Sequence, residues 1–326
     1  MTEILGQEKA LSYLAAVVRS QRVPGAFLFH GPDGVGKKMA ALEFAKALNC
    51  LHPVAGRPCN ACENCYATDK GIYPDTVLID FEYQARLEMK KDAASKGYEE
   101  ELEKEIAKQQ HLKVDTIRHA VTKSQQKAIG TGGWKVLIVD GAQTMERSAA
   151  NALLKFIEEP PAKTTWILIT NKRAAMLKTI LSRCQPLAFA PLATETVTQL
   201  LCSEIEDASL AAQYGGGSLS GTRAAAQAIA LLHGGEFGTP AGPCQVAGEL
   251  SRTLVTARQE AQGILDVLVQ ALHQKWTAQT DVRRAHRYQQ LLKQFENYKR
   301  SIARNVSPAL VVETALMAMD GADITI

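Results

Sequence analysis

The sequence has no apolar run that approaches the ~18 residues of a membrane-spanning helix. Its first residues, MTEILGQEKALSYL, lack the basic start, apolar centre and small-residue cleavage site of a secretory signal peptide. Neither sign of charge is in large excess, because the net charge is +3 over 326 residues. That balance neither requires nor excludes a nucleic-acid partner. We expect no membrane association and a cytoplasmic location.

Cysteine is scarce and unevenly placed. The chain has seven cysteines; four lie between residues 50 and 65, and Cys184, Cys202 and Cys244 are scattered. An odd, uneven set in a large chain does not suit a disulfide framework. It indicates a reducing compartment and a metal site.

The four clustered cysteines lie in NCLHPVAGRPCNACENC with the spacing C-x8-C-x2-C-x2-C, and they are Cys50, Cys59, Cys62 and Cys65. Two close C-x2-C steps let several thiolates converge on one tetrahedral ion, and Cys50 supplies the fourth sulfur. The spacing predicts structural Zn²⁺. The alternative is a set of buried or redox-active thiols, but Gly, Pro and Asn surround these cysteines rather than an apolar core. His52 is a weaker candidate ligand, because four sulfurs already fill the site.

The fragment HGPDGVGKKM lacks one residue of a phosphate-binding P-loop, G-x-x-x-x-G-K-[S/T]. Gly31, Gly34, Gly36 and Lys37 match the pattern, and Lys38 stands where a hydroxyl would hold Mg²⁺. Glycines let backbone N–H groups approach phosphates, and the following helix start adds partial positive charge. A strand before the loop and a helix after it give the context that a P-loop needs. A glycine turn without function is the less favoured alternative.

A second residue that ATP hydrolysis usually requires is also missing. The apolar run VLIVD ends in Asp140, which is the Walker B pattern for orienting Mg²⁺ or its water. In working ATPases of this kind the next residue is usually Glu, and here it is Gly141. Lys38 and Gly141 together predict that hydrolysis is lost, whereas ATP binding is left open.

Strand and helix patterns alternate in the first part of the chain. Apolar strand candidates are 26–30, 75–80, 135–140 and 164–170, separated by helical patterns. This order predicts an α/β fold with a parallel sheet. The segment 81–112 is rich in Glu and Lys and is expected to be a charged helical insertion. After Pro191 the strand signals fade, and two helical regions, 191–235 and 244–326, flank a Gly/Pro-rich linker at 234–243.

Three segments resemble bacterial clamp-loader subunits of the AAA+ class, which belong to DNA polymerase III. They are NALLKFIEEPP (151–161), LSRCQPL (181–187) and NVSPALVVETALM (305–317). A zinc insertion directly after the P-loop helix is also typical of the family's gamma and delta-prime branches. The resemblance implies an AAA+ domain over 1–190 with a zinc module at 50–65, a helical lid over 191–235 and an oligomerising collar over 244–326.

Within that family the resemblance favours the delta-prime branch. Gamma-type subunits carry Lys-Thr in the P-loop and Asp-Glu in Walker B, and this chain has neither; its SAAN, 148–151, also looks like delta-prime. The resemblance implies a non-hydrolysing stator that assembles with gamma/tau-type and delta subunits in the polymerase III holoenzyme. Such a complex loads the sliding clamp on primer-template DNA. Arg183, in Ser-Arg-Cys, would act in trans as an arginine finger on a neighbour's ATP, and Arg223, in GTRAAA, is assigned to the degenerate nucleotide site.

Two other functions stay open. One is a gamma-like active ATPase that uses Lys38 and Gly141 in an unusual way. The other is a zinc-dependent nucleic-acid-binding protein with a vestigial nucleotide domain. The near-neutral residues around the cysteines, with Arg57 the only clear cation, argue against the latter.

Overall fold

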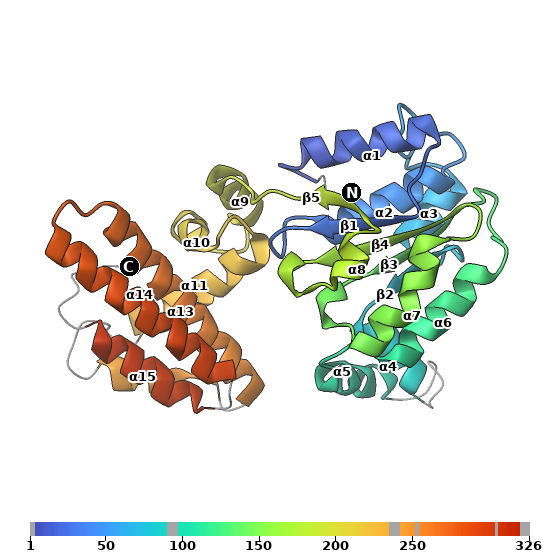
Figure 1. The fold of residues 1–326 in the computed structure, drawn as a ribbon. Helices are drawn as coiled ribbons and strands as arrows, with labels where there is room; N and C mark the ends of the chain where they lie inside the picture. Colours follow the sequence, from blue (N-terminus) through green and yellow to red (C-terminus); the bar gives the residue numbers. More distant parts are fainter. Residues whose placement is uncertain (1–3, 90–96, 235–241, 252–253, 304–305, 320–326) are drawn as a thin grey trace. The chain divides into compact units, whose positions relative to one another are not determined.

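The computed structural model describes residues 4–89, 97–234, 242–251, 254–303 and 306–319. The chain divides into two compact units, Met1–Ala190 and Pro191–Ile326. The first contains the sheet and its covering helices, and the second is helical (Figure 1). This division separates the nucleotide-type motifs from the C-terminal helices.

Among the described residues, five parallel strands form one sheet in the order β2-β3-β4-β1-β5. The strands are β1 (Ala26–His30), β2 (Thr76–Ile79), β3 (Lys135–Val139), β4 (Thr164–Thr170) and β5 (Gln185–Ala188). The helices of this unit are α1 (Glu8–Ser20), α2 (Lys37–Asn49), α3 (Glu63–Asp69), α4 (Phe81–Glu88), α5 (Tyr98–Lys108), α6 (Val114–Gln125), α7 (Arg147–Glu158) and α8 (Lys178–Leu181), with short 3₁₀ turns η1 (Ala142–Thr144) and η2 (Arg173–Ala175). The predicted α/β fold with a parallel sheet is confirmed.

Both faces of the sheet are buried, which explains its nearly continuous apolar strands. Along β1, Phe27 packs edge-on against Phe44 of α2, with ring centroids 5.4 Å apart. Leu28 instead joins the core that includes Ile117 of α6 and Leu153 of α7. Successive residues of a strand point to opposite faces, so α2 covers one face while α6 and α7 cover the other.

The edge strand β5 was not predicted from the sequence. Its four residues, QPLA, are mostly exposed and include Pro186. Proline cannot donate to a ladder and is confined to edge strands, and β5 pairs only with β1 among the described strands. Without a buried apolar run, no strand signal was present.

The carboxyl ends of parallel strands lie at one edge of the sheet, and this edge gathers the polar residues of the P-loop region. β1 leads into the glycine loop at Gly31, β2 into Asp80, β3 into Asp140 and β4 into Asn171. These residues are far apart in sequence. The topology makes them neighbours in space.

The second unit consists of helices, most of which pack on one apolar core. They are α9 (Thr194–Leu201), α10 (Ala208–Tyr214), α11 (Leu219–Gly234), α12 (Gly242–Glu249), α13 (Leu254–Thr277), α14 (Val282–Ala303) and α15 (Pro308–Ala318). The core extends from Ala211 on α10 to Met319, directly after α15, and has Phe295 of α14 fully buried within it. The expected linker at 234–243 falls largely outside the described residues, so the division into 191–235 and 244–326 stays a prediction.

The charged segment 81–112 contains α4 and α5, with residues 90–96 between them outside the described structure. Gly97 precedes α5 with φ of +80°, a conformation that suits glycine. Buried Tyr98 and Leu102 pack with Ala85 in a small local core.

Among the helices of the described residues, none is both long and apolar enough to cross a membrane.

Candidate functional site

The glycine loop between β1 and α2 depends on backbone conformations that only glycine adopts easily. Gly31, Gly34 and Gly36 have φ of +151°, +72° and +94°. At Gly31 a Cβ atom would lie 2.2 Å from the carbonyl oxygen of Phe189, which belongs to the segment after β5. The loop is therefore held tightly against the carboxyl edge of the sheet.

Lys37 is turned onto its own loop. Its side chain is 5% exposed, and Nζ donates to the carbonyl oxygens of Gly31, at 2.8 Å, and Pro32. Asp33 Oδ1 lies 3.7 Å from the same nitrogen. Burial lowers the pKa of Lys37 against the opposing attraction of Asp33 and Asp140. In this conformation its hydrogen-bonding capacity is used within the loop.

Lys38 lies between two carboxylates that directly follow neighbouring strands, β2 and β3. Its Nζ is 3.2 Å from Asp80 Oδ2 and 3.5 Å from Asp140 Oδ2. Burial alone would lower the pKa of Lys38, but the attraction of Asp80 and then of Asp140 outweighs it and raises the pKa. A tethered ammonium thus occupies the space between the two acidic groups.

Asp80 and Asn171 are residues of this edge that the sequence interpretation did not include. Asn171 follows β4, and its Nδ2 donates to Asp33 Oδ2 on the glycine loop. Its Oδ1 is buried and has no hydrogen-bond partner among the described residues. The signal that would have found both is simple, since each is the first polar residue after an apolar parallel strand.

The four cysteines of the predicted metal site converge. All four Sγ atoms lie within 4.8 Å of one another, and the Cys50–Cys62 and Cys59–Cys65 sulfur pairs are each 3.9 Å apart. Cys59 N donates to Cys50 Sγ at 3.2 Å, and Cys62 N donates to Cys59 Sγ at 3.4 Å. Burial opposes ionisation of Cys62, yet backbone hydrogen bonds from Leu51 and Cys65 are among the contacts that lower the pKa of its thiol to about 6. These contacts favour a thiolate at Cys62, the form that metals bind, whereas burial raises the pKa of the Cys50 and Cys65 thiols.

Two asparagines attach the cysteine module (residues 50–65) to the sheet. Asn64 Nδ2 donates to the carbonyl oxygen of Asn49 at 2.7 Å and to Thr131 Oγ1 at 3.0 Å. Asn49 is fully buried and exchanges two 3.0 Å hydrogen bonds with the backbone of Trp134, directly before β3. The module is therefore fixed to the segment that enters β3, the strand that leads into Asp140.

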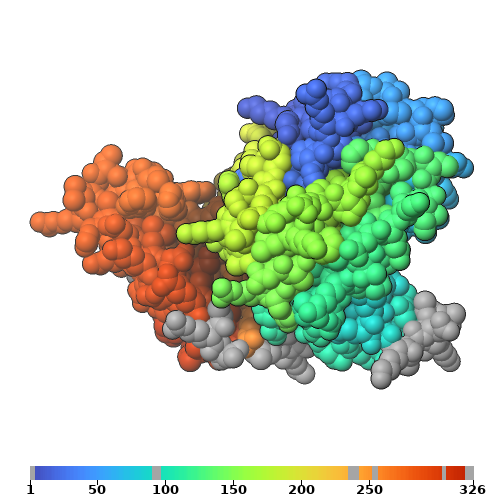
Figure 2. Space-filling model, turned by 45° about the vertical axis from the view of Figure 1, so that its right-hand side comes forward, coloured from blue at the N-terminus to red at the C-terminus, as the bar shows by residue number. Residues whose placement is uncertain are grey.

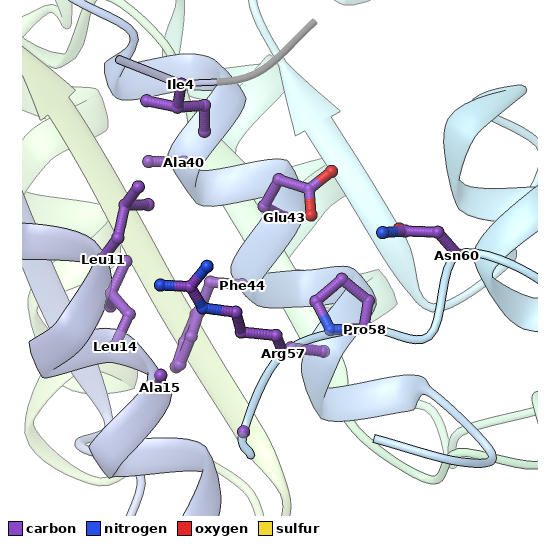
Figure 3. Close-up of a pocket in the computed structure, with 12 residues that line it drawn as sticks. Ile4, Leu11, Leu14, Ala15, Ala40, Glu43, Phe44, Arg57, Pro58 and Asn60 are labelled. Atoms are coloured by element: carbon purple, nitrogen blue, oxygen red, sulfur yellow. The ribbon is translucent and has the colours of Figure 1, made fainter. Parts of the chain in front are cut away.

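A cavity of 340 Å³ lies between α1, α2 and the cysteine module (Figure 3). Leu11 and Leu14 of α1 and Phe44 of α2 form its apolar wall. Arg57, the one clear cation of the cysteine segment, extends across this cavity toward α1 in Figure 3.

Arg183 lies at the opposite edge of the sheet from the glycine loop. It lines a surface groove with Gly25, just before β1, and Gln185, the first residue of β5. Its Nε donates to Glu158 Oε1 on α7, and Nη1 donates to the carbonyl oxygen of Thr179 at 3.1 Å. The five residues of β1 span about 13 Å, so Arg183 is remote from Lys37 and Lys38 of the same chain.

Arg223, assigned to the nucleotide site from the sequence, does not belong to the unit that contains the glycine loop. It lies on α11 of the second unit, where Nε and Nη2 donate to Glu204 Oε2 at 3.0 and 2.8 Å. Of the predicted nucleotide-site residues, the structure gathers the loop glycines, Lys37 and Asp140 at one edge of the sheet.

The chain is similar in sequence to subunits of DNA polymerase III. The delta' subunits of DNA polymerase III from Bacillus subtilis and Pseudomonas aeruginosa are each 33% identical over 61% and 63% of this chain. The tau/gamma subunit of Haemophilus influenzae is 35% identical over 56% of it. These matches span 52%, 56% and 22% of the relatives' own lengths, so the chain matches about half of them or less.

A solved structure shares the fold over most of the chain. It is the DNA polymerase III gamma subunit-related protein of Thermotoga maritima, with a TM-score of 0.50 and 17% identity, covering 94% of this chain and 97% of that one. The family model for DNA polymerase III, delta subunit, matches residues 6–193. That match covers more than half of the chain and agrees with the resemblance drawn from its motifs, and the chain belongs to the DNA polymerase III delta subunit family.

Proposed function

We propose that this chain is a non-hydrolysing, delta-prime-type subunit of the DNA polymerase III clamp loader. The observation that carries the proposal is the ammonium of Lys38 between Asp80 and Asp140. Carboxylates at this place would hold Mg²⁺ or its waters, and phosphoryl transfer depends on that ion to neutralise developing charge. The single positive charge of Lys38 offsets part of their negative charge instead, and it repels a divalent cation.

Activation of water is the second step that this chain does not support. Gly141 follows Asp140 with φ of +74° and carries no side chain to polarise an attacking water. The glycine loop still offers backbone N–H groups at the start of α2, so phosphate binding without turnover is compatible with the geometry. The loop's role is then structural within a ring of subunits.

The cysteine module fits a structural Zn²⁺ ion. Tetrahedral zinc with Zn–S bonds of ~2.3 Å sets its sulfurs about 3.8 Å apart, and two of the sulfur pairs here are 3.9 Å apart. Cys50, Cys59, Cys62 and Cys65 would hold the ion and complete its coordination, leaving no open position for catalysis. The ion would contribute folding free energy to the module.

Arg183 would serve a neighbouring subunit's ATP. It is 38% exposed, lines a groove and lies away from its own glycine loop. Hydrogen bonds to Glu158 and Thr179 fix the guanidinium in one orientation. An always-charged planar fork is suited to stabilise charge on transferring phosphoryl oxygens.

The helices of the second unit would provide the assembly surface, with residues 191–235 as the lid and 244–326 as the collar. The proposed partners are gamma/tau-type and delta subunits, and through the complex the sliding clamp and primer-template DNA. The gamma-like alternative is favoured by one observation only, the identity of up to 35% to tau/gamma relatives.

ATP turnover by the purified chain separates the two candidates. We expect no multiple-turnover hydrolysis above that of a Lys37→Ala variant, with or without DNA. Adding the chain to candidate gamma-type and delta subunits should produce DNA-dependent ATPase and clamp loading that the partners alone lack. Turnover by the chain alone that Lys37→Ala abolishes would establish the gamma-like function instead.

A further inference from the structure

The helix α14 concentrates positive charge in the second unit. Its 22 residues include six arginines and lysines and one glutamate, whereas the whole chain has a net charge of +3. The remainder of the chain is therefore slightly acidic. An asymmetry of this size on one helix indicates an anionic partner.

Much of this charge lies along one solvent-facing line. Tyr288, Leu291 and Phe295 face the core of the unit. An α-helix turns by about 100° per residue, so four basic residues of α14 lie on the side opposite these three, within an arc of about 100°. This set is exposed and is named the basic stripe; its members are Arg283, His286, Lys293 and Arg300. From end to end it spans about 25 Å.

The cations of the stripe are not used to hold the fold. Lys299, on the flank, is paired with Asp266 of α13 at 2.6 Å. Within the described residues, by contrast, no ion pair involves the side chains of Arg283, Lys293 or Arg300. An ordinary solvated helix face mixes both signs. Glu296 is the single acid of α14 and lies beside the stripe.

An exposed aromatic ring adjoins one end of the stripe. Trp276, in the last turn of α13, is 37% exposed, and its ring centroid lies 5.4 Å from that of His273. Only residues 278–281 separate α13 from α14, so this turn neighbours the start of the stripe. Lys275 adds a further exposed cation there. The helices α13 and α14 pack along each other. Figure 2 shows the C-terminal part of the chain, coloured orange to red, at the surface.

We propose that the basic stripe and Trp276 form a binding surface for single-stranded DNA. Unpaired cations spaced along a helix suit the repeating phosphates of a backbone, and an exposed indole suits stacking on an unpaired base. The surface belongs to the second unit and is separate from the glycine loop and from Arg183. Phosphate contacts supply affinity without sequence preference, so recognition at this surface is independent of base order.

The test uses the full chain and a labelled oligothymidylate of about 20 nucleotides. Fluorescence anisotropy is measured across a salt series for the wild type and for the triple variant Arg283→Gln, Lys293→Gln, Arg300→Gln. Removing three phosphate contacts should weaken binding at least tenfold and flatten the log–log salt slope by about 2. Trp276→Phe should abolish the quenching of indole fluorescence that the oligonucleotide causes, while retaining the salt slope.

A matched control removes the same charge elsewhere. Lys9, Lys104 and Lys127 are exposed lysines of the first unit, and changing all three to Gln should leave binding unchanged. Equal loss in this control would overturn the proposal, because net charge alone would then explain binding. Absence of oligonucleotide binding, or stripe-dependent binding of polyglutamate in its place, would also overturn it and assign the stripe to an acidic protein partner. Circular dichroism of both triple variants checks that the helices persist.

Discussion

The ammonium nitrogen of Lys38 lies 3.5 Å from Asp140 Oδ2, at the point where the strand with the Walker B pattern ends. A residue from the first turn of α2 and the residue directly after β3 therefore form an ion pair. The raised pKa of Lys38 keeps it charged. Its stabilising contribution is complete below the ordinary lysine pKa of about 10.4 and is lost only as pH rises through the higher folded-state value.

Replacing Lys38 with Thr should convert this pair into a divalent-cation site. Asp80 and Asp140 would then face a hydroxyl instead of an ammonium. If Mg²⁺ binds with a Kd near 1 mM, 10 mM Mg²⁺ adds about 1.4 kcal/mol, or roughly 3–6 °C in Tm. Thermal unfolding with and without Mg²⁺ checks this, and the wild type should show no such shift. The double variant Lys38→Thr, Asp140→Asn should lose the response; a response that persists in it would place the ion elsewhere.

The cysteine module should contain about one zinc per chain. Changing Cys50, Cys59, Cys62 and Cys65 to Ser should eliminate the metal and lower the stability of the first unit, because thiolate–metal bonds contribute folding free energy. Elemental analysis and thermal unfolding are the measurements. Cys202→Ser, at an exposed cysteine outside the module, is the control and should retain full zinc content. Zinc that survives the quadruple change would contradict the assignment.

Arg183→Ala should leave folding and ring assembly intact and lower the ATPase of the assembled complex. Arginine fingers contribute roughly 10³–10⁵ in rate in GTPases, and a smaller drop is expected where other sites in the ring keep theirs. Arg183→Lys should restore little, because an ammonium lacks the planar fork.

Arg118 of α6 is the matched control for that substitution. It is an exposed arginine paired with Asp115 at 3.3 Å. A pair of this kind is typically worth ~0–1 kcal/mol, so Arg118→Ala should change neither ATPase nor loading. Equal rates for the Arg183→Ala and wild-type complexes would remove the finger from the mechanism.

Gly31→Ala should destabilise the first unit more than Gly71→Ala does. Both glycines have positive φ, so both substitutions strain the backbone by ~1–3 kcal/mol. Only at Gly31 does the new Cβ meet a backbone atom, the Phe189 carbonyl oxygen at 2.2 Å; at Gly71 nothing lies within 4 Å. The extra loss at Gly31 should be about 1–3 kcal/mol. Urea unfolding of the two variants measures the difference, and equal values would show that the loop relaxes freely.

Sequence patterns predicted the buried strands well because each is an apolar run bounded by loop residues. β1 and β4 begin and end where expected, and β3 is one residue shorter at its end. The first helix begins at Glu8, shortly after Gly6, which has φ of +73°. Local sequence contains no strong signal for such a boundary.

The candidate site was predicted only where a residue lies within a recognisable motif. Lys38 was noted as an unusual residue, but its partner Asp80 was not identified, because the pairing of β2 with β3 is a long-range property. Asn171 was missed because its contact with Asp33 joins residues that are 138 positions apart in the sequence. The convergence of the four cysteines could be predicted from the sequence, because they are close enough along the chain for local geometry to bring them together.

The hydrogen bonds of buried Asn49 make the cysteine module and the entry to β3 parts of a single cooperative element. Segments joined in this way unfold locally as one unit, so their backbone amides show similar protection against hydrogen exchange. An ion held by the cysteines would then raise the free energy of local unfolding of β3, although it would not contact that strand. The stability of the amino-terminal end of β3 would in this sense depend, through one asparagine, on any metal that the cysteines hold.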